Sequence, residues 1–159
     1  MTRPTPVALH HTCFVVHDLE GAARTLSDSL AIGPWNVWTI EPERSTVHGV
    51  EQPFSFRVAL TEVGGGTYEL ITPHVGRSVY DEHLEQFGNG FHHTCMLYPT
   101  LQAVRDAKAA LLDDGRVMLQ EGSGGDVFDF AYFDFPEIGS PIELLFLNPE
   151  KLPEPEAVI

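Results

Sequence analysis

Hydrophobic positions along the chain follow the period of a strand and then that of a helix, in the same order twice. A short apolar run at 9–16 precedes apolar residues at helical spacing, with Asp18 as the expected N-cap. A second apolar run at 91–98 precedes another helical stripe, with Thr100 as its expected N-cap. The order of predicted elements therefore indicates an internal duplication.

Three strand-like segments follow each predicted helix, and glycine runs at 64–66 and 124–125 mark turns within them. These glycine runs lack the spacing of a phosphate-binding loop. We also predict a short helix over 79–87, between the two halves. The strand-like segments are 35–40, 54–62 and 67–73 in the first half, and 116–122, 127–135 and 141–147 in the second. The pattern predicts an α+β fold of two βαβββ modules.

The boundaries of the modules follow from this pattern. A chain of 159 residues has the length of one domain and can bury its own core. We expect a single domain over 1–159, with module one at about 7–75 and a linker at about 76–90. Module two is expected at about 91–148, and a Pro-rich tail at 149–159.

The tetrapeptide HHTC occurs in both modules, at 10–13 and at 92–95, on the first predicted strand of each. Successive side chains of a strand point to opposite faces, so the two histidines of a copy cannot face the same cavity. Periodicity leaves open which histidine of each pair faces inward.

The last predicted strand of each module carries a glutamate between apolar neighbours, Glu69 in YELI and Glu143 in IELL. A buried carboxylate costs several kcal/mol unless it is paired or binds a metal. Two histidines and two glutamates at matching positions of a duplicated unit therefore suggest one shared metal site. Taken singly, a strand histidine is more often an ordinary core residue.

The charge and the cysteines restrict the partners and the compartment. With 9 basic and 23 acidic residues, the formal net charge is −14, which argues against nucleic acid and anionic membranes as partners. Two cysteines, Cys13 and Cys95, form no CxxC motif and are expected to be free thiols in a reducing compartment. The N-terminus lacks a signal-peptide pattern, and no run approaches 18 apolar residues. We expect a cytoplasmic protein.

Several motifs together resemble the vicinal oxygen chelate, or glyoxalase-like, superfamily. They are HHTCFVVHDLEGA, LAIGPW, GGGTYELITP, GNGFHHTCMLY and FAYFDFPEIGSPIELLFL, and the resemblance covers about residues 8–148. It implies a curved, incomplete eight-stranded barrel around a divalent metal. The closest similarity is to methylmalonyl-CoA epimerase-like and glyoxalase I-like members.

The resemblance selects the second histidine of each pair and implies the metal ligands His11, Glu69, His93 and Glu143. The sequence differs from the epimerases on the third strand of module one, where Phe56 and Arg57 stand in place of a carboxylate base. In its absence, Glu143 is the first candidate for the catalytic base and Glu69 the second.

A mixed set of imidazoles and carboxylates suits one divalent transition metal, namely Ni, Co, Mn, Zn or Fe, rather than Mg or Ca. The implied function is an isomerase, epimerase or lyase that acts on a small carbonyl or thioester substrate through a metal-stabilised enolate or enediolate. We expect a small-molecule substrate and a homodimer that covers exposed sheet edges.

Two other functions remain open on the same fold. One is Fe(II)-dependent extradiol ring cleavage, which a fourth carboxylate ligand disfavours. The other is a small-molecule binding or resistance protein with an apolar cup. Candidate aromatic residues for such a cup, most of them more simply core, are Trp35, Trp38, Phe54, Phe56, Phe128, Phe130 and Tyr132.

Overall fold

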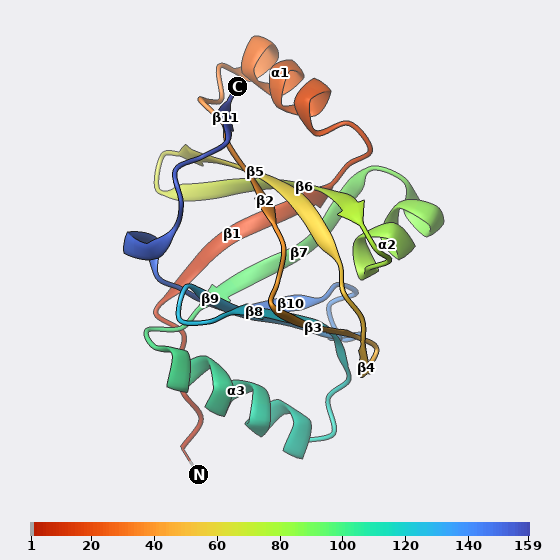
Figure 1. Cartoon of the computed structure of the whole chain (residues 1–159), viewed down its shortest axis with the longest axis vertical. Coiled ribbons are helices and arrows are strands. Elements are labelled where there is room, and N and C mark those ends of the chain that lie inside the picture. The colour runs from red at the N-terminus through yellow and green to blue at the C-terminus, as the bar shows by residue number, and fades with distance from the viewer. Residues whose placement is uncertain (1) are drawn as a thin grey trace. The chain divides into compact units, whose positions relative to one another are not determined.

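A computed structural model describes residues 2–159 and contains three α-helices and eleven strands in that range (Figure 1). The helices are α1 (Leu19–Leu30), α2 (Val79–Phe87) and α3 (Leu101–Asp113), and a 3₁₀ turn spans Pro149–Lys151. The strands are β1 (Ala8–Val15), β2 (Asn36–Ile40), β3 (Arg44–Val47), β4 (Val50–Glu51), β5 (Ser55–Val63), β6 (Gly66–Val75), β7 (Gly90–Leu97), β8 (Met118–Gly124), β9 (Phe128–Phe133), β10 (Ile142–Leu147) and β11 (Ala157–Val158).

The chain forms two compact units. The N-terminal unit comprises His11–Glu41, Phe54–His92 and Pro153–Ile159. Its strands follow the order β11-β2-β5-β6-β1, with β1 parallel to β6 and the other pairs antiparallel. Helix α1 packs on one face of this sheet over a cluster that includes Trp35, Ala59 and Leu70.

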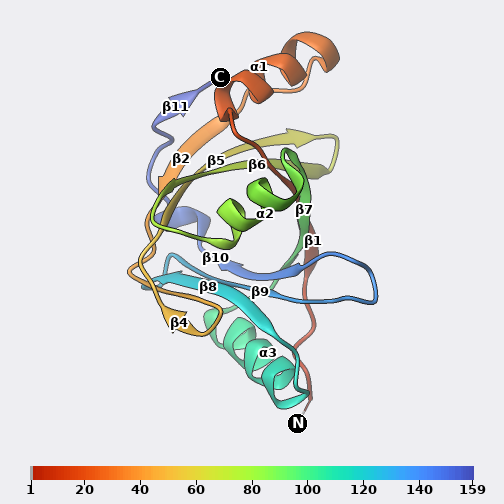
Figure 2. The ribbon, with the colours of Figure 1, turned by 90° about the vertical axis from the view of Figure 1, so that its right-hand side faces the viewer.

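The C-terminal unit comprises residues 2–10, Pro42–Pro53 and His93–Leu152. Its strands follow the order β7-β10-β9-β8-β3-β4, with β7 parallel to β10 and the other pairs antiparallel. Helix α3 lies along one face of β9 and β10 (Figure 2). Val104, Ala131, Phe133 and Leu144 form the core beneath it.

Side chains cap the two long helices as the sequence predicts. The carboxylate of Asp18 accepts a hydrogen bond from the Gly21 amide at 2.9 Å, and the hydroxyl of Thr100 accepts one from the Ala103 amide at 3.0 Å. Each bond satisfies an amide that the first helical turn would otherwise leave without a partner. The predicted helix at 79–87 is also confirmed.

The α+β class and all eight predicted strands are confirmed, but the expected number of strands was too low. The three additional strands are β3, β4 and β11. These segments lack a clear apolar alternation, and they are held by pairing with the edges of other strands. β3 pairs with β8, and β11 pairs with β2. Such pairing depends on tertiary structure, which local periodicity does not encode.

Within residues 2–159, none of the helices has the length and apolar composition needed to cross a lipid bilayer.

Two leucines at opposite ends of α1 test how far the fold depends on the core under this helix. Leu19 is 1% exposed and Leu30 is 63% exposed. We expect Leu19→Ala to lower the free energy of unfolding by about 2–5 kcal/mol, because it removes buried methyl groups and leaves a cavity. Leu30→Ala should change it by less than about 0.5 kcal/mol. Urea denaturation measures both, and equal losses would contradict this packing.

Candidate metal centre

In the N-terminal unit, His11 of β1 and Glu69 of β6 lie against each other on neighbouring parallel strands. Cys13 and Glu69 are register partners, so their side chains share a face, and His11 shares it because it precedes Cys13 by two residues. Nε2 of His11 is in direct contact with Oε2 of Glu69. Both side chains are buried.

The C-terminal unit repeats this arrangement with His93 of β7 and Glu143 of β10. Here Cys95 is the register partner of Glu143. Nε2 of His93 lies 3.0 Å from Oε2 of Glu143, and both residues are buried. The duplication in sequence is therefore also a duplication of local geometry, residue for residue.

Strand alternation explains why each glutamate faces away from the helix of its unit. Leu70 belongs to the core under α1, and Leu144 belongs to the core under α3. The residue before each leucine must point to the opposite face of its strand. The apolar face that each helix requires thus fixes the direction of Glu69 and Glu143.

The first histidine of the second motif has different surroundings. His92 is buried, and its ring lies 5.7 Å from the ring of Tyr80 and 5.2 Å from that of His83, both on α2. The two histidines of this motif therefore take separate roles, as the geometry of a strand requires. His10, the first histidine of the other copy, is half-buried on β1.

Two further buried residues share the face of Glu143. Tyr132 is the register partner of Glu143 on β9, and its ring lies 4.6 Å from that of His93. Gln120 of β8 is the register partner of Tyr132 and is fully buried. Sequence reasoning included Tyr132 only among the aromatic candidates and missed Gln120. No signal in the sequence indicated it, because alternation with the apolar Leu119 would place Gln120 on the outward face.

The third strand of module one, β5, supplies no buried carboxylate to the face of Glu69, because its one acidic residue, Glu62, is exposed. Phe56 is buried and its ring lies 5.1 Å from that of Tyr80. Arg57 donates a hydrogen bond to Glu20 of α1 at 2.6 Å, which lowers the pKa of the Glu20 carboxyl. Arg57 therefore lies on the helix side of β5.

Most of the aromatic candidates for a cup are buried. Trp35 lies in the core beneath α1, which is a structural position. Phe54, Phe56, Phe130 and Tyr132 are also buried, whereas Trp38 and Phe128 are half-buried.

The donor chemistry of each pair fits a divalent transition metal. One imidazole nitrogen and one carboxylate oxygen are in contact in each unit, at buried positions where an uncompensated charge is costly. Mixed nitrogen and oxygen ligands suit Mn, Fe, Co, Ni or Zn, whereas Mg and Ca prefer oxygen alone.

A comparison with protein families matches residues 10–132 to the glyoxalase/bleomycin resistance protein/dioxygenase superfamily. The chain belongs to this superfamily. The similarity inferred from the sequence motifs is therefore confirmed at the level of the superfamily. Among proteins of curated function, none matches the chain in sequence.

Several solved structures share the fold. Methylmalonyl-CoA epimerase from Mycobacterium tuberculosis aligns with a TM-score of 0.63 and 20% identity, over 94% of each chain. A variant of the Streptomyces coelicolor epimerase, in complex with 2-nitronate-propionyl-CoA, aligns with a TM-score of 0.62 and 19% identity, over 94% of this chain and 99% of that one. A mutant of 4-hydroxymandelate synthase from Streptomyces coelicolor aligns with a TM-score of 0.54 and 15% identity, over 97% of this chain and 52% of that one.

His83, beside His92, gives a test of the packing next to the candidate centre. Burial lowers the pKa of His83 below its usual 6.5, because the charged ring is poorly solvated there. The folded protein should therefore bind this proton less readily than the unfolded chain. The folded state is therefore more stable above pH 6.5, where the ring is neutral in both states. This advantage is lost as the pH falls through the folded-state pKa of His83.

NMR titration of the histidine rings measures this pKa directly. We expect a value below 6.5 for His83. A His83→Gln variant should lose less stability between pH 7 and pH 5 than the unmodified protein does. The matched control is His74→Gln, at an exposed position. A His83 pKa at or above 6.5 would contradict the packing of α2 against β7.

Proposed function

We propose that His11, Glu69, His93 and Glu143 bind one divalent transition-metal ion, Ni, Co, Mn, Zn or Fe, and that the chain is a metal-dependent isomerase, epimerase or lyase. The observation that carries the proposal is the pair of equivalent histidine–glutamate contacts, one in each unit. Each pair alone supplies only two ligands. Four ligands are typical of a closed set around such an ion, and a five- or six-coordinate ion keeps positions for substrate.

Proton transfer next to a carbonyl is the reaction that this set of residues supports best. A bound ion supplies Lewis acidity, which stabilises negative charge on a carbonyl oxygen. The protein must supply the base that accepts the α-proton. β5 offers no buried one, because Phe56 is apolar, Arg57 is paired with Glu20, and Glu62 is exposed. The base is therefore Glu143 or, as second choice, Glu69.

The substrate class in this proposal is a small carbonyl compound or thioester. The shared fold with methylmalonyl-CoA epimerases supports a thioester among these. Both cysteines are buried and form no disulfide, in keeping with a reducing, cytoplasmic location. The proposal includes a homodimer that covers exposed strand edges.

Ring cleavage by an Fe(II) dioxygenase is less well supported. Glu69 lies against His11, where it would act as a fourth protein ligand. Such a ligand fills a coordination position that oxygen or a catechol needs.

Metal analysis of ligand variants tests the site. We expect about one ion per chain in the unmodified protein and at least about a tenfold loss of affinity in His11→Ala, Glu69→Ala, His93→Ala and Glu143→Ala. His74→Ala is the matched control, because His74 is exposed, and it should keep full loading. Unchanged metal content in the four variants would refute the site.

Glu143→Gln tests the base. This change keeps the size of the side chain and an oxygen ligand but removes the carboxylate that accepts a proton. We expect the variant to retain metal and to lose at least about 100-fold in the rate of α-proton exchange into deuterated water. Proton NMR of candidate thioesters and ketoaldehydes measures this exchange. Full exchange by a metal-loaded Glu143→Gln protein would exclude Glu143 as the base.

A further inference from the structure

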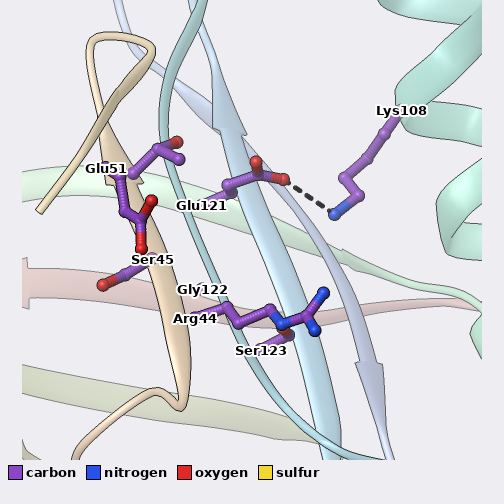
Figure 3. A pocket seen from close by; sticks show the side chains of 8 residues that line it. Arg44, Ser45, Glu51, Lys108, Glu121, Gly122 and Ser123 are labelled. Atoms are coloured by element: carbon purple, nitrogen blue, oxygen red, sulfur yellow. Dashed lines mark hydrogen bonds and ion pairs between the residues drawn. The ribbon is translucent and has the colours of Figure 1, made fainter. Parts of the chain in front are cut away.

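The C-terminal unit contains a cavity of about 500 Å³ where the β3–β4 hairpin, β8 and α3 meet (Figure 3). This volume lies within the range of pockets that bind small molecules. Apart from Gly122, the residues that line it have polar side chains, among them Arg44, Thr46, Glu51, Lys108, Glu121 and Ser123.

The polar wall of this cavity lies on the opposite face of the sheet from Glu143. Ser123 and Glu121 of β8 are register partners of Asp129 and Ala131, and Ala131 lies in the core beneath α3. Gln120, one residue before Glu121, is the register partner of Tyr132 on the face of Glu143. The cavity is therefore separate from the candidate metal centre.

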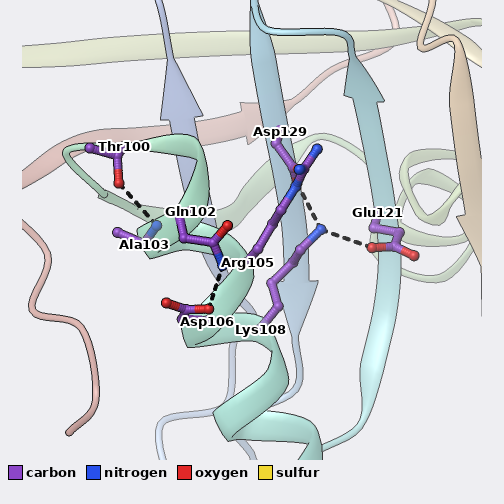
Figure 4. Close-up of polar contacts among 8 residues, drawn as sticks. All are labelled: Thr100, Gln102, Ala103, Arg105, Asp106, Lys108, Glu121 and Asp129. Atoms are coloured by element: carbon purple, nitrogen blue, oxygen red, sulfur yellow. Dashed lines mark hydrogen bonds and ion pairs between the residues drawn. The ribbon is translucent and has the colours of Figure 1, made fainter.

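Ion pairs offset much of the negative charge beside the cavity. The ammonium of Lys108 lies 2.7 Å from Oδ1 of Asp129 and 3.0 Å from Oε2 of Glu121 (Figure 4). Arg105 adds a contact of 3.3 Å to the same aspartate, which is buried. On the side of β8 and α3, an anion that enters the cavity thus meets carboxylates, those of Glu121 and Asp129, that are already paired with cations.

Arg44 is the basic residue of this unit that is available to bind a ligand. Within residues 2–159, the structure gives it no carboxylate partner, and its guanidinium lies beside Ser123 in the cavity (Figure 3). The other basic residues of this unit are all in ion pairs, namely Arg3, Arg105, Lys108, Arg116 and Lys151. Although the protein has 23 acidic residues against 9 basic ones, the guanidinium of Arg44 is therefore available to an incoming anion.

The polar groups of the β3–β4 hairpin also include some that are available to a ligand. The hydroxyl of Ser45 donates to the carbonyl of Gln52 at 2.7 Å and is thereby occupied. Oγ1 of Thr46 has no hydrogen-bond partner among the described residues, although it is buried. Glu51, the register partner of Thr46, adds an exposed carboxylate on the hairpin side of the cavity.

We propose that this cavity binds a small oxyanion, a phosphate ester or a carboxylate, that also carries a hydroxyl or amino group. The guanidinium of Arg44 binds the oxyanion through two parallel hydrogen bonds, and Ser123 donates a third. Glu51 accepts a hydrogen bond from the hydroxyl or amino group at the other end of the ligand. This site is independent of the metal centre and of the reaction proposed above.

Calorimetric titration with glycerol 3-phosphate and with glycerate tests the site, since the two probes separate phosphate from carboxylate. We expect saturable binding of at least one of them, beyond the effect of sodium chloride at the same ionic strength. Arg44→Gln should weaken this binding by about tenfold or more, because it removes a charged bidentate donor.

Arg24→Gln is the matched control. It removes the same charge from an exposed position on α1, in the other unit. We expect this variant to bind the probe within about twofold of the unmodified protein, since Arg24 does not line the cavity. The proposal is overturned if neither probe binds, if Arg44→Gln binds equally well, or if Arg24→Gln loses as much affinity as Arg44→Gln.

Discussion

The contact between a strand histidine and a glutamate on the neighbouring parallel strand is the constraint around which each unit is organised. A buried carboxylate is tolerated only when a partner compensates for its lost hydration. Parallel pairing of β1 with β6, and of β7 with β10, places each glutamate beside the cysteine two residues after the histidine. The leucine that follows each glutamate packs beneath α1 or α3 on the other face of the sheet. This packing fixes the direction in which each glutamate points.

Segments from the opposite half of the sequence complete both units. Residues 42–53 follow β2 in the chain but belong to the C-terminal unit, where β3 pairs with β8. Residues 153–159 follow β10 but belong to the N-terminal unit, where β11 pairs with β2. Each segment covers a strand edge that would otherwise expose unpaired backbone groups. The first of them also brings Arg44 to the cavity beside α3.

Sequence reasoning succeeded where local chemistry and repetition agreed. The caps at Asp18 and Thr100, the stripes of both long helices and the eight main strands are all encoded within short windows. The two HHTC copies indicated the internal duplication, but strand alternation alone left open which histidine of each pair faces the glutamate. That choice needed the resemblance to a family, and the structure places His11 beside Glu69 and His93 beside Glu143.

Features that depend on distant pairing were not predictable in this way. β3, β4 and β11 are short and gain their order from edges formed elsewhere in the chain. Gln120 faces inward because of its register with Tyr132, and a register shift lies just before it on β8. Local periodicity does not encode such a shift.

X-ray absorption spectroscopy of the cobalt-loaded protein tests the central claim most directly, because it counts the imidazole ligands of each ion. If both units contribute to one centre, the unmodified protein should show two imidazoles per cobalt, and any cobalt retained by His93→Ala should show one. A spectrum with a single imidazole per ion in the unmodified protein, or with none, would contradict a shared metal centre.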